Sequence, residues 1–320
     1  MRCPTAERRP ICPGARFGDF PETMIQAKRR PIDILSMFLL LAMHLAAVLV
    51  VWVPFSWSVV ALAIGGYCLR MFAITAGFHR YFAHRSFKTS RVVQFLLALV
   101  GTMAMQNGPL WWASWHRHHH KHSDTQRDTH SPRMHGLWHA HLGWVLDGKH
   151  DLPDLSNVRD LARFPELRFL ERHKWLPLIA YALACLAIGG WAGLVWGFVV
   201  STLCLFHAIC LINSLAHLWG SRPYATTDDS RNNAVLAVLT LGEGWHNNHH
   251  HCMNSARQGF LWWELDVTYY VIKLFERLGI VWDVRTPRVM AGSRRGASSG
   301  LPGVVPVPVA VTAVSGAAGA

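Results

Sequence analysis

The stretch Trp111-Trp112-Ala113-Ser114-Trp115-His116-Arg117-His118-His119-His120-Lys121-His122 is the most unusual part of a chain that contains 20 histidines. Residues of an α-helix advance by about 100° each, so three of these rings fall on one side of such a helix: His116, His119 and His120. His118 then points to the opposite side. The same His-x-x-His-His spacing returns at His246-Asn247-Asn248-His249-His250. Two copies that each aim three imidazoles one way indicate metal ligands rather than a solvated polar run.

The overall composition indicates a membrane protein. Of the 320 residues, 51% are hydrophobic and only 16% are charged, which suggests membrane spans rather than an average soluble domain. The net charge of +12 is not organised into a basic recognition helix, so we expect no nucleic-acid partner. The 7 cysteines form no Cys-x-x-Cys pair, which argues against a disulfide framework and against an iron–sulfur centre.

Four apolar runs predict membrane-spanning helices, at about 32–53, 57–77, 176–189 and 191–216. The loops within each pair, Pro54-Phe55-Ser56 and Gly189-Gly190, are short and uncharged, which predicts two hairpins. His44 and His207 lie inside the runs, and we expect both to pack against other helices.

The two hairpins place both termini and all histidine-rich segments on one side of the membrane. Lys28-Arg29-Arg30 flanks the first span, whereas both inter-span loops lack Lys and Arg, so the positive-inside rule assigns that side to the cytoplasm. We therefore expect a cytoplasmic N-terminal tail over 1–31, one domain over 32–285 and a disordered low-complexity tail over 286–320.

Nine histidines on that side are candidate ligands: His79, His84, His116, His119, His120, His217, His246, His249 and His250. Nine imidazoles exceed what one ion accepts and fit two, although imidazole suits iron, zinc, copper and nickel alike. His79 and His84 fall about 140° apart on an ideal helix, so they converge only if the helix frays or bends there. The predicted fold is an all-α integral membrane protein, with four transmembrane helices in two hairpins and a cytoplasmic helical cap that holds a dinuclear histidine-ligated site.

Four histidine boxes in this order resemble the membrane fatty acid desaturases of the stearoyl-CoA Δ9 type. The resemblance covers about 32–285, and Thr75-Ala76-Gly77 and Gly242-Glu243-Gly244-Trp245 also look like this family. The matching boxes are His79-Arg80-Tyr81-Phe82-Ala83-His84, His116-Arg117-His118-His119-His120, Asn213-Ser214-Leu215-Ala216-His217 and His246-Asn247-Asn248-His249-His250.

The resemblance implies a di-iron centre with a defined division of ligands. One iron would take His79, His84, His116, His120 and His250. The other would take His119, His217, His246 and His249, with Asn213 holding a water near its open position. By the same resemblance, Gln106, Asn107 and Trp112 match positions near the acyl tunnel.

The implied reaction is the O2-dependent removal of two hydrogens from adjacent methylenes of a long acyl chain, which leaves a cis double bond. Δ9 desaturation of an acyl-CoA is the first expectation. Electrons must come from a separate ferredoxin, cytochrome b5 or reductase, because the chain shows no fused cytochrome b5 segment and no dinucleotide-binding fingerprint. The expected location is an integral, multi-pass membrane protein whose active site faces the cytoplasm.

Three alternatives stay open beside this reading. Animal acyl-CoA desaturases tend to have Trp-Ala-Arg-Asp before the second box, whereas this chain has Trp112-Ala113-Ser114-Trp115, so an acyl-lipid substrate is a second hypothesis. A related di-iron fatty acid or alkane hydroxylase would share the histidines but insert oxygen. A metal transporter would need polar ligands in the middle of its spans, where His44 and His207 are the candidates.

Overall fold

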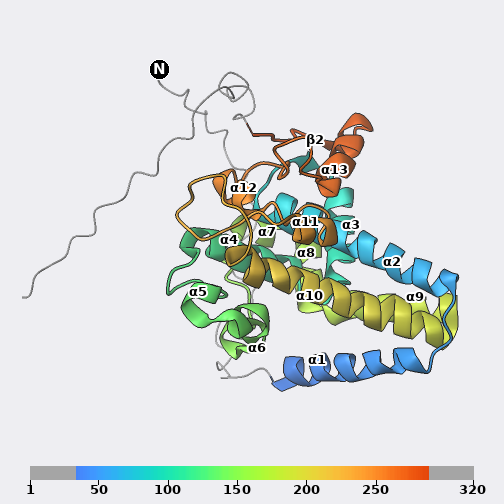
Figure 1. The fold of residues 1–320 in the computed structure, drawn as a ribbon. Helices are drawn as coiled ribbons and strands as arrows, with labels where there is room; N and C mark the ends of the chain where they lie inside the picture. The colour runs from blue at the N-terminus through green and yellow to red at the C-terminus, as the bar shows by residue number, and fades with distance from the viewer. Residues whose placement is uncertain (1–33, 288–320) are drawn as a thin grey trace, which may run out of the picture. The chain divides into compact units, whose positions relative to one another are not determined.

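The computed structural model describes residues 34–287, which form an almost wholly helical structure (Figure 1). The predicted N-terminal tail, 1–31, and nearly all of the predicted disordered tail, 286–320, lie outside the described residues. The two short strands, β1 (Lys88–Thr89) and β2 (Val281–Trp282), pair antiparallel and join distant parts of the chain.

Three helical segments are long and apolar enough to cross a membrane, at 34–51, 57–83 and 175–217, where four separate spans were expected. The first two match the first predicted hairpin, and the third contains both of the remaining predicted runs. The elements of the three segments are α1 (Ile34–Ala47) with η3 (Val48–Val51), α2 (Trp57–Phe72) with η4 (Ala73–Ala83), and α9 (Trp175–Ala192) followed by η7 (Gly193–Val200), α10 (Ser201–Ser214) and η8 (Leu215–His217).

The third segment folds back on itself at Gly190. This residue has φ 58° and ψ −148°, a backbone conformation that glycine adopts without a steric penalty. The Tyr181 hydroxyl donates to the carbonyl oxygen of Gly197 at 2.8 Å, although 16 residues would span about 24 Å along a straight helix. The segment is therefore a tight helical hairpin rather than one straight rod.

Polar groups inside these segments turn toward other helices. Arg70 is fully buried and donates to the hydroxyls of Thr202 and Ser201 in α10, each at 2.6 Å. His44 Nε2 lies 3.0 Å from His207 Nε2, which joins α1 to α10 and agrees with the expected packing role. Lipid offers such groups no partner, so helix–helix contacts must satisfy them.

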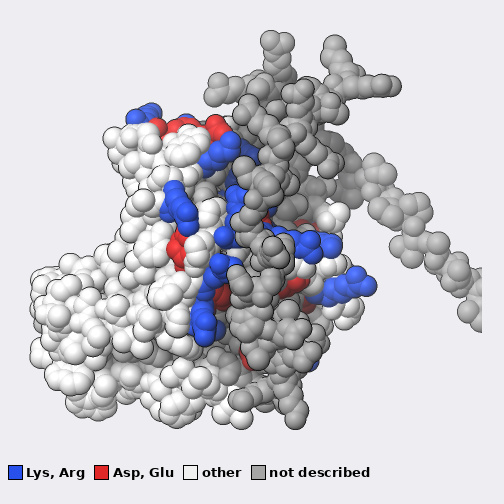
Figure 2. Space-filling model, turned by 180° about the vertical axis from the view of Figure 1, so that it is seen from behind, with Lys and Arg blue, Asp and Glu red and all other residues white. Residues whose placement is uncertain are grey.

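On one face of the molecule, the apolar surface and the charged surface lie in separate regions. Figure 2 shows it from behind: the far ends of the apolar segments carry no Lys, Arg, Asp or Glu on this face, and Lys and Arg gather beside them. This distribution is typical of a membrane-embedded part next to a solvated one.

The other helices form a cap away from the turn at Gly190 (Figure 1). The largest core cluster joins the cap to the apolar segments and includes the buried side chains of Phe78, Leu110 and Leu167, from η4, α4 and α8. The cap comprises α3 (Arg91–Thr102), α4 (Pro109–His122), α5 (Pro132–His135), η5 (His139–Gly143), α6 (Trp144–Leu146), η6 (Gly148–His150), α7 (Arg159–Ala162), α8 (Pro165–Arg172), α11 (Ala234–Leu239), α12 (His246–His251) and α13 (Val267–Arg277).

Candidate metal centre

The N-terminus of α4, the helix of the second histidine box, is held by a buried carboxylate. Pro109 occupies its first turn, where the missing N–H costs nothing. Glu171 of α8 accepts the backbone N–H groups of Leu110 and Trp111, each at 2.9 Å. These N–H groups have no partner within the helix, so the carboxylate caps α4 and fixes it against α8.

α4 aims its histidines in three directions. His116 and His120, one turn apart, point into one group of imidazoles, and His119 points into a second group. His118 lies on the far side, as predicted, and its Nε2 donates to the carbonyl oxygen of Arg127 at 2.8 Å. The position of His118 agrees with the prediction, whereas His119 does not share one direction with His116 and His120.

The first group, here named the five-histidine group, has closely facing Nε2 atoms. His116 Nε2 lies 2.9 Å from both His84 Nε2 and His120 Nε2, and His249 Nε2 lies 3.0 Å from His79 Nε2 and 2.9 Å from His120 Nε2. Its members are His79, His84, His116, His120 and His249.

The helix bends between His79 and His84, which is the condition for the two rings to converge. η4 is a π-helix, and the N–H of His84 donates to the carbonyl oxygen of His79, five residues back, at 3.1 Å. The two imidazole centroids lie 4.8 Å apart. A π-helical turn therefore brings together two rings that a regular α-helix would separate.

The second group, here named the four-histidine group, corrects the expected division of ligands. His250 lies here and His249 lies in the five-histidine group, the reverse of the expectation. The reason is helical phase, because His246 and His250 are i and i+4 on α12 and share a face. The group consists of His119, His217, His246 and His250.

Each His-x-x-His-His motif thus contributes histidines to both groups, but the two motifs divide their positions between the groups in opposite ways. The second box sends its i and i+4 rings to the five-histidine group and its i+3 ring to the four-histidine group. The last box does the reverse. The two groups are therefore linked through two short helices, α4 and α12.

The nitrogen arrangement fits metal ligation. An Nε2 atom carries either a proton or a lone pair, so His116 Nε2 cannot donate to one neighbouring ring and accept from the other. Nitrogens that bind one ion at about 2.1 Å and at right angles lie about 3 Å apart, which agrees with the separations of 2.9–3.1 Å in the two groups. His119 Nε2 and His250 Nε2 are also buried without a hydrogen-bond partner.

The protonation state of the rings suits the same role. Burial and repulsion from neighbouring imidazoles hold the pKa of five histidines well below the usual value, and burial lowers the pKa of His250 to about 4 against the pull of Asp228. Neutral imidazole is the form that binds metals. The five are His84, His116, His120, His246 and His249.

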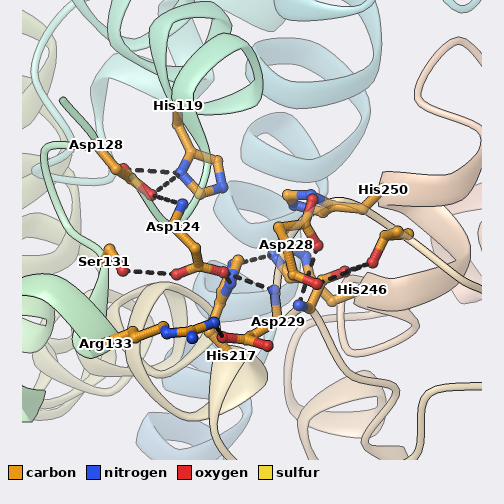
Figure 3. Close-up of polar contacts among 12 residues, drawn as sticks. His119, Asp124, Asp128, Ser131, Arg133, His217, Asp228, Asp229, His246 and His250 are labelled. Carbon is orange, nitrogen blue, oxygen red and sulfur yellow. Dashed lines mark hydrogen bonds and ion pairs between the residues drawn. The ribbon is translucent and has the colours of Figure 1, made fainter. Parts of the chain in front are cut away.

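Carboxylates behind the rings were not identified from the sequence (Figure 3). His119 Nδ1 lies 3.0 Å from Asp128 and His217 Nδ1 lies 2.8 Å from Asp124. Burial opposes ionisation of Asp124, yet hydrogen bonds from His217 and Ser131 hold its pKa below the usual value. His250 Nδ1 contacts Asp228, and His79 Nδ1 contacts Glu243. One available signal was the presence of acids near the histidine boxes in a chain with few acids.

A small cavity of about 30 Å³ touches both groups. Ile74, Ile209 and Ile212 supply apolar walls, and Asn213 and Trp112 also line it. Members of both groups reach the cavity: His79 and His116 from the five-histidine group, and His119 and His246 from the four-histidine group. Trp112 stacks on His116 with ring centroids 4.7 Å apart.

The other two predicted substrate residues lie elsewhere. Asn107 lines a separate cavity of about 60 Å³ between α1, α6, α9 and α10, where its side-chain oxygen accepts from Lys174 at 2.5 Å. The side-chain nitrogen of Gln106 is buried without a hydrogen-bond partner, and Gln106 is outside the linings of both cavities.

A profile of the fatty acid desaturase family matches residues 55–282. The chain belongs to this family, as the four histidine boxes indicated, and is therefore an oxidoreductase of lipid metabolism whose family acts on fatty acyl chains with O2.

Individual relatives cover most of the chain. It is 43% identical over 238 residues to an acyl-CoA C20 Delta5-desaturase of Anemone leveillei, which covers 73% of this chain and 76% of the relative. It is 37% identical over 276 residues to delta-9 acyl-lipid desaturase 1 of Arabidopsis thaliana (85% and 90%). It is 38% identical over 267 residues to the sn-1 stearoyl-lipid 9-desaturase of Anabaena variabilis (82% and 97%).

Proposed function

We propose that this chain introduces a cis double bond into a long-chain fatty acyl substrate, using O2 and a di-iron centre. The observation that carries the proposal is the cavity between the two histidine groups. Its volume of about 30 Å³ and its isoleucine walls suit a short piece of hydrocarbon better than a hydrated polar group. A methylene pair held there is close to imidazoles of both groups.

The nine histidines would hold the two ions, five around one and four around the other, with Asn213 holding a water beside the four-histidine group. Bound iron would supply the oxidising power that unactivated C–H bonds require, because acid–base catalysis does not break such bonds. Donor type alone suits several metals, and the desaturase family favours iron.

The protein itself positions and shields the reacting carbons. Ile74, Ile209 and Ile212 give the cavity an apolar side, and Trp112 forms a wall against His116. We assign Gln106 and Asn107 to the path of the acyl chain beyond this point. Fixed geometry then selects one methylene pair, for which we propose the Δ9 position.

We propose acyl-CoA as the first candidate carrier and acyl-lipid as the second. A hollow of about 430 Å³ on the cap is lined by Trp115, Arg127 and Lys149, and also by Asp128 and Asp147. Lys149 pairs with Asp147 at 3.3 Å, so we propose Arg127 as the contact for a phosphate-bearing head group. Ser114 is fully buried and bonded to the carbonyl oxygen of Trp111, so it offers a head group no contact. That feature favours the acyl-lipid alternative, and the relatives include enzymes named for each carrier.

The reaction requires electrons from a partner. Two substrate hydrogens, two electrons and two protons reduce one O2 to two waters, so a ferredoxin, cytochrome b5 or reductase must deliver two electrons per double bond. We propose four membrane crossings in two hairpins, which place the cap and both termini at the cytoplasmic face, where such a donor is soluble.

The function is tested by expression in a host that makes no unsaturated fatty acids. Restored growth and a new alkene in the host lipids are expected, and mapping of the double bond gives its position. Separate analysis of the thioester and lipid pools after a short pulse of labelled fatty acid identifies the carrier. Hydroxy fatty acid without alkene would overturn the proposal in favour of a hydroxylase.

A further inference from the structure

The two histidine groups differ in the carboxylates behind them. In the described part of the chain, only one ring of the five-histidine group, His79, has such a partner, Glu243. Three rings of the four-histidine group each have one (Figure 3): His119–Asp128 at 3.0 Å, His217–Asp124 at 2.8 Å and His250–Asp228 at 2.7 Å.

The charge around these carboxylates also differs. Glu243 pairs with buried Arg80, whose Nη2 donates to it at 3.0 Å, and Arg80 also pairs with Asp266 at 3.0 Å. The carboxylates of Asp124, Asp128 and Asp228 have no Lys or Arg partner within residues 34–287. Buried anions without a cation are costly. A bound dication would therefore be stabilised more beside the four-histidine group than beside the five-histidine group.

The buried aspartates are held in place by other groups. Asp124 accepts from the Ser131 hydroxyl at 2.6 Å and from the N–H of Asp229 at 2.7 Å. Asp128 accepts from the N–H of Asp124 at 2.9 Å. Because these donors fix the carboxylates, the carboxylates in turn fix the imidazole planes.

The hydrogen bonds also fix the tautomers. An ionised carboxylate only accepts, so Nδ1 of each partner ring carries the proton and Nε2 keeps its lone pair. In the four-histidine group, His119 Nε2 and His250 Nε2 are buried without a hydrogen-bond partner. His246 Nδ1 is also buried without one, so among the described residues this ring of the group has no carboxylate behind it. In the five-histidine group, His120 Nδ1 and His249 Nδ1 are buried without a partner, so no carboxylate fixes those two rings.

From these contacts we infer that the four-histidine group is the tighter of two metal sites, and that Asp124, Asp128 and Asp228 are the positioning residues that make it so. The inference rests on the proposed dinuclear centre and adds a ranking of its two sites. Partners of this kind typically change metal affinity by about 10–100-fold.

The test titrates metal-free, full-length protein in detergent with Co²⁺ and follows the visible absorption of the bound ion. Wild type should bind in two classes of unequal affinity. His84→Ala should remove the weaker class, because His84 belongs to the five-histidine group. Asp228→Asn should weaken the tighter class about 10–100-fold, and Asp228→Glu should restore part of the loss.

Glu243→Gln is the matched control, since this carboxylate adjoins the five-histidine group, and it should change the weaker class alone. Asp128→Asn repeats the test at a second position, so one variant that fails to fold does not decide the result. Equal affinity of the two ions, loss of the tighter class in His84→Ala, or an unchanged tighter class in both aspartate variants would overturn the inference. Two unequal ions in a protein that makes no alkene would count against the proposed function instead.

Discussion

The backbone N–H of His84 donates to the carbonyl oxygen of His79 at 3.1 Å, across five residues rather than the four of an α-helix. This π-helical turn ends η4 and brings His84 into the five-histidine group. Such turns occur often at functional sites, because they redirect a side chain that a regular helix would send elsewhere.

His84→Ala should therefore lower the bound metal from about two ions per chain to about one, with loss of desaturation. His118→Ala is the matched control from another box, and it should keep both ions because His118 faces Arg127. Metal analysis of the purified proteins measures the difference. Two ions retained by His84→Ala would contradict the assignment of His84.

His249 and His250 lie in the opposite groups from those expected, and this predicts which class of bound metal each variant loses. His249→Ala should remove the same class of bound metal as His84→Ala, and His250→Ala the same class as His217→Ala. Co²⁺ titration of the four variants groups them. If His250→Ala grouped with His84→Ala, the division found in the structure would be wrong.

The cavity between the groups predicts a steric block. Ile212→Trp should fill the space of about 30 Å³ and lower desaturation by at least about tenfold, at a cost of about 1–3 kcal/mol in stability from overpacking. Ile212→Val should keep most activity. Bound metal should be unchanged in both variants, so product analysis beside metal analysis separates a blocked cavity from a lost centre.

The cap of α4 predicts a pH dependence. Burial raises the pKa of Glu171 above its ordinary 4.5, against the two backbone N–H groups and Lys174. The folded protein then binds more protons than the unfolded chain above pH 4.5, so this contribution to stability is lost as pH rises through the folded-state pKa. Glu171→Gln keeps an acceptor for α4 and should flatten that fall in thermal unfolding curves. Glu171→Ala should cost about 1 kcal/mol at low pH through the lost cap, and this cost should shrink as pH rises.

The proposed topology predicts labelling from opposite sides. In a cysteine-free variant, Ser56→Cys in the loop between α1 and α2 should react with a membrane-impermeant maleimide only from the non-cytoplasmic side. Thr227→Cys in the cap should react only from the cytoplasmic side. Labelling of both positions from one side would exclude the two-hairpin arrangement.

Several features followed from local spacing alone. The phase of an α-helix was enough to separate His118 from its three neighbours, and the four boxes in order were enough to identify the family. The apolar runs predicted where the three candidate spans lie, because length and hydropathy are properties of a continuous segment. The division at Gly190 followed as well, although the structure folds the last two runs into one helical hairpin.

Other features depended on tertiary packing. Spacing alone left open whether the chain would bend at His84, because a π-helical turn is stabilised by surrounding contacts rather than by the residues themselves. The carboxylates behind the rings were also unpredicted, since Asp228 and His250 meet through the fold of a loop and a short helix.

The division of His249 and His250 illustrates the limit. Their sequence determined that they face different ways on α12, because consecutive residues of a helix are about 100° apart. Which histidine group each one meets was decided by how α12 packs against α4 and η4, which are more than a hundred residues away in the chain. Helical phase is a local property, whereas the partner that a helix face meets is set by the packing of the whole cap.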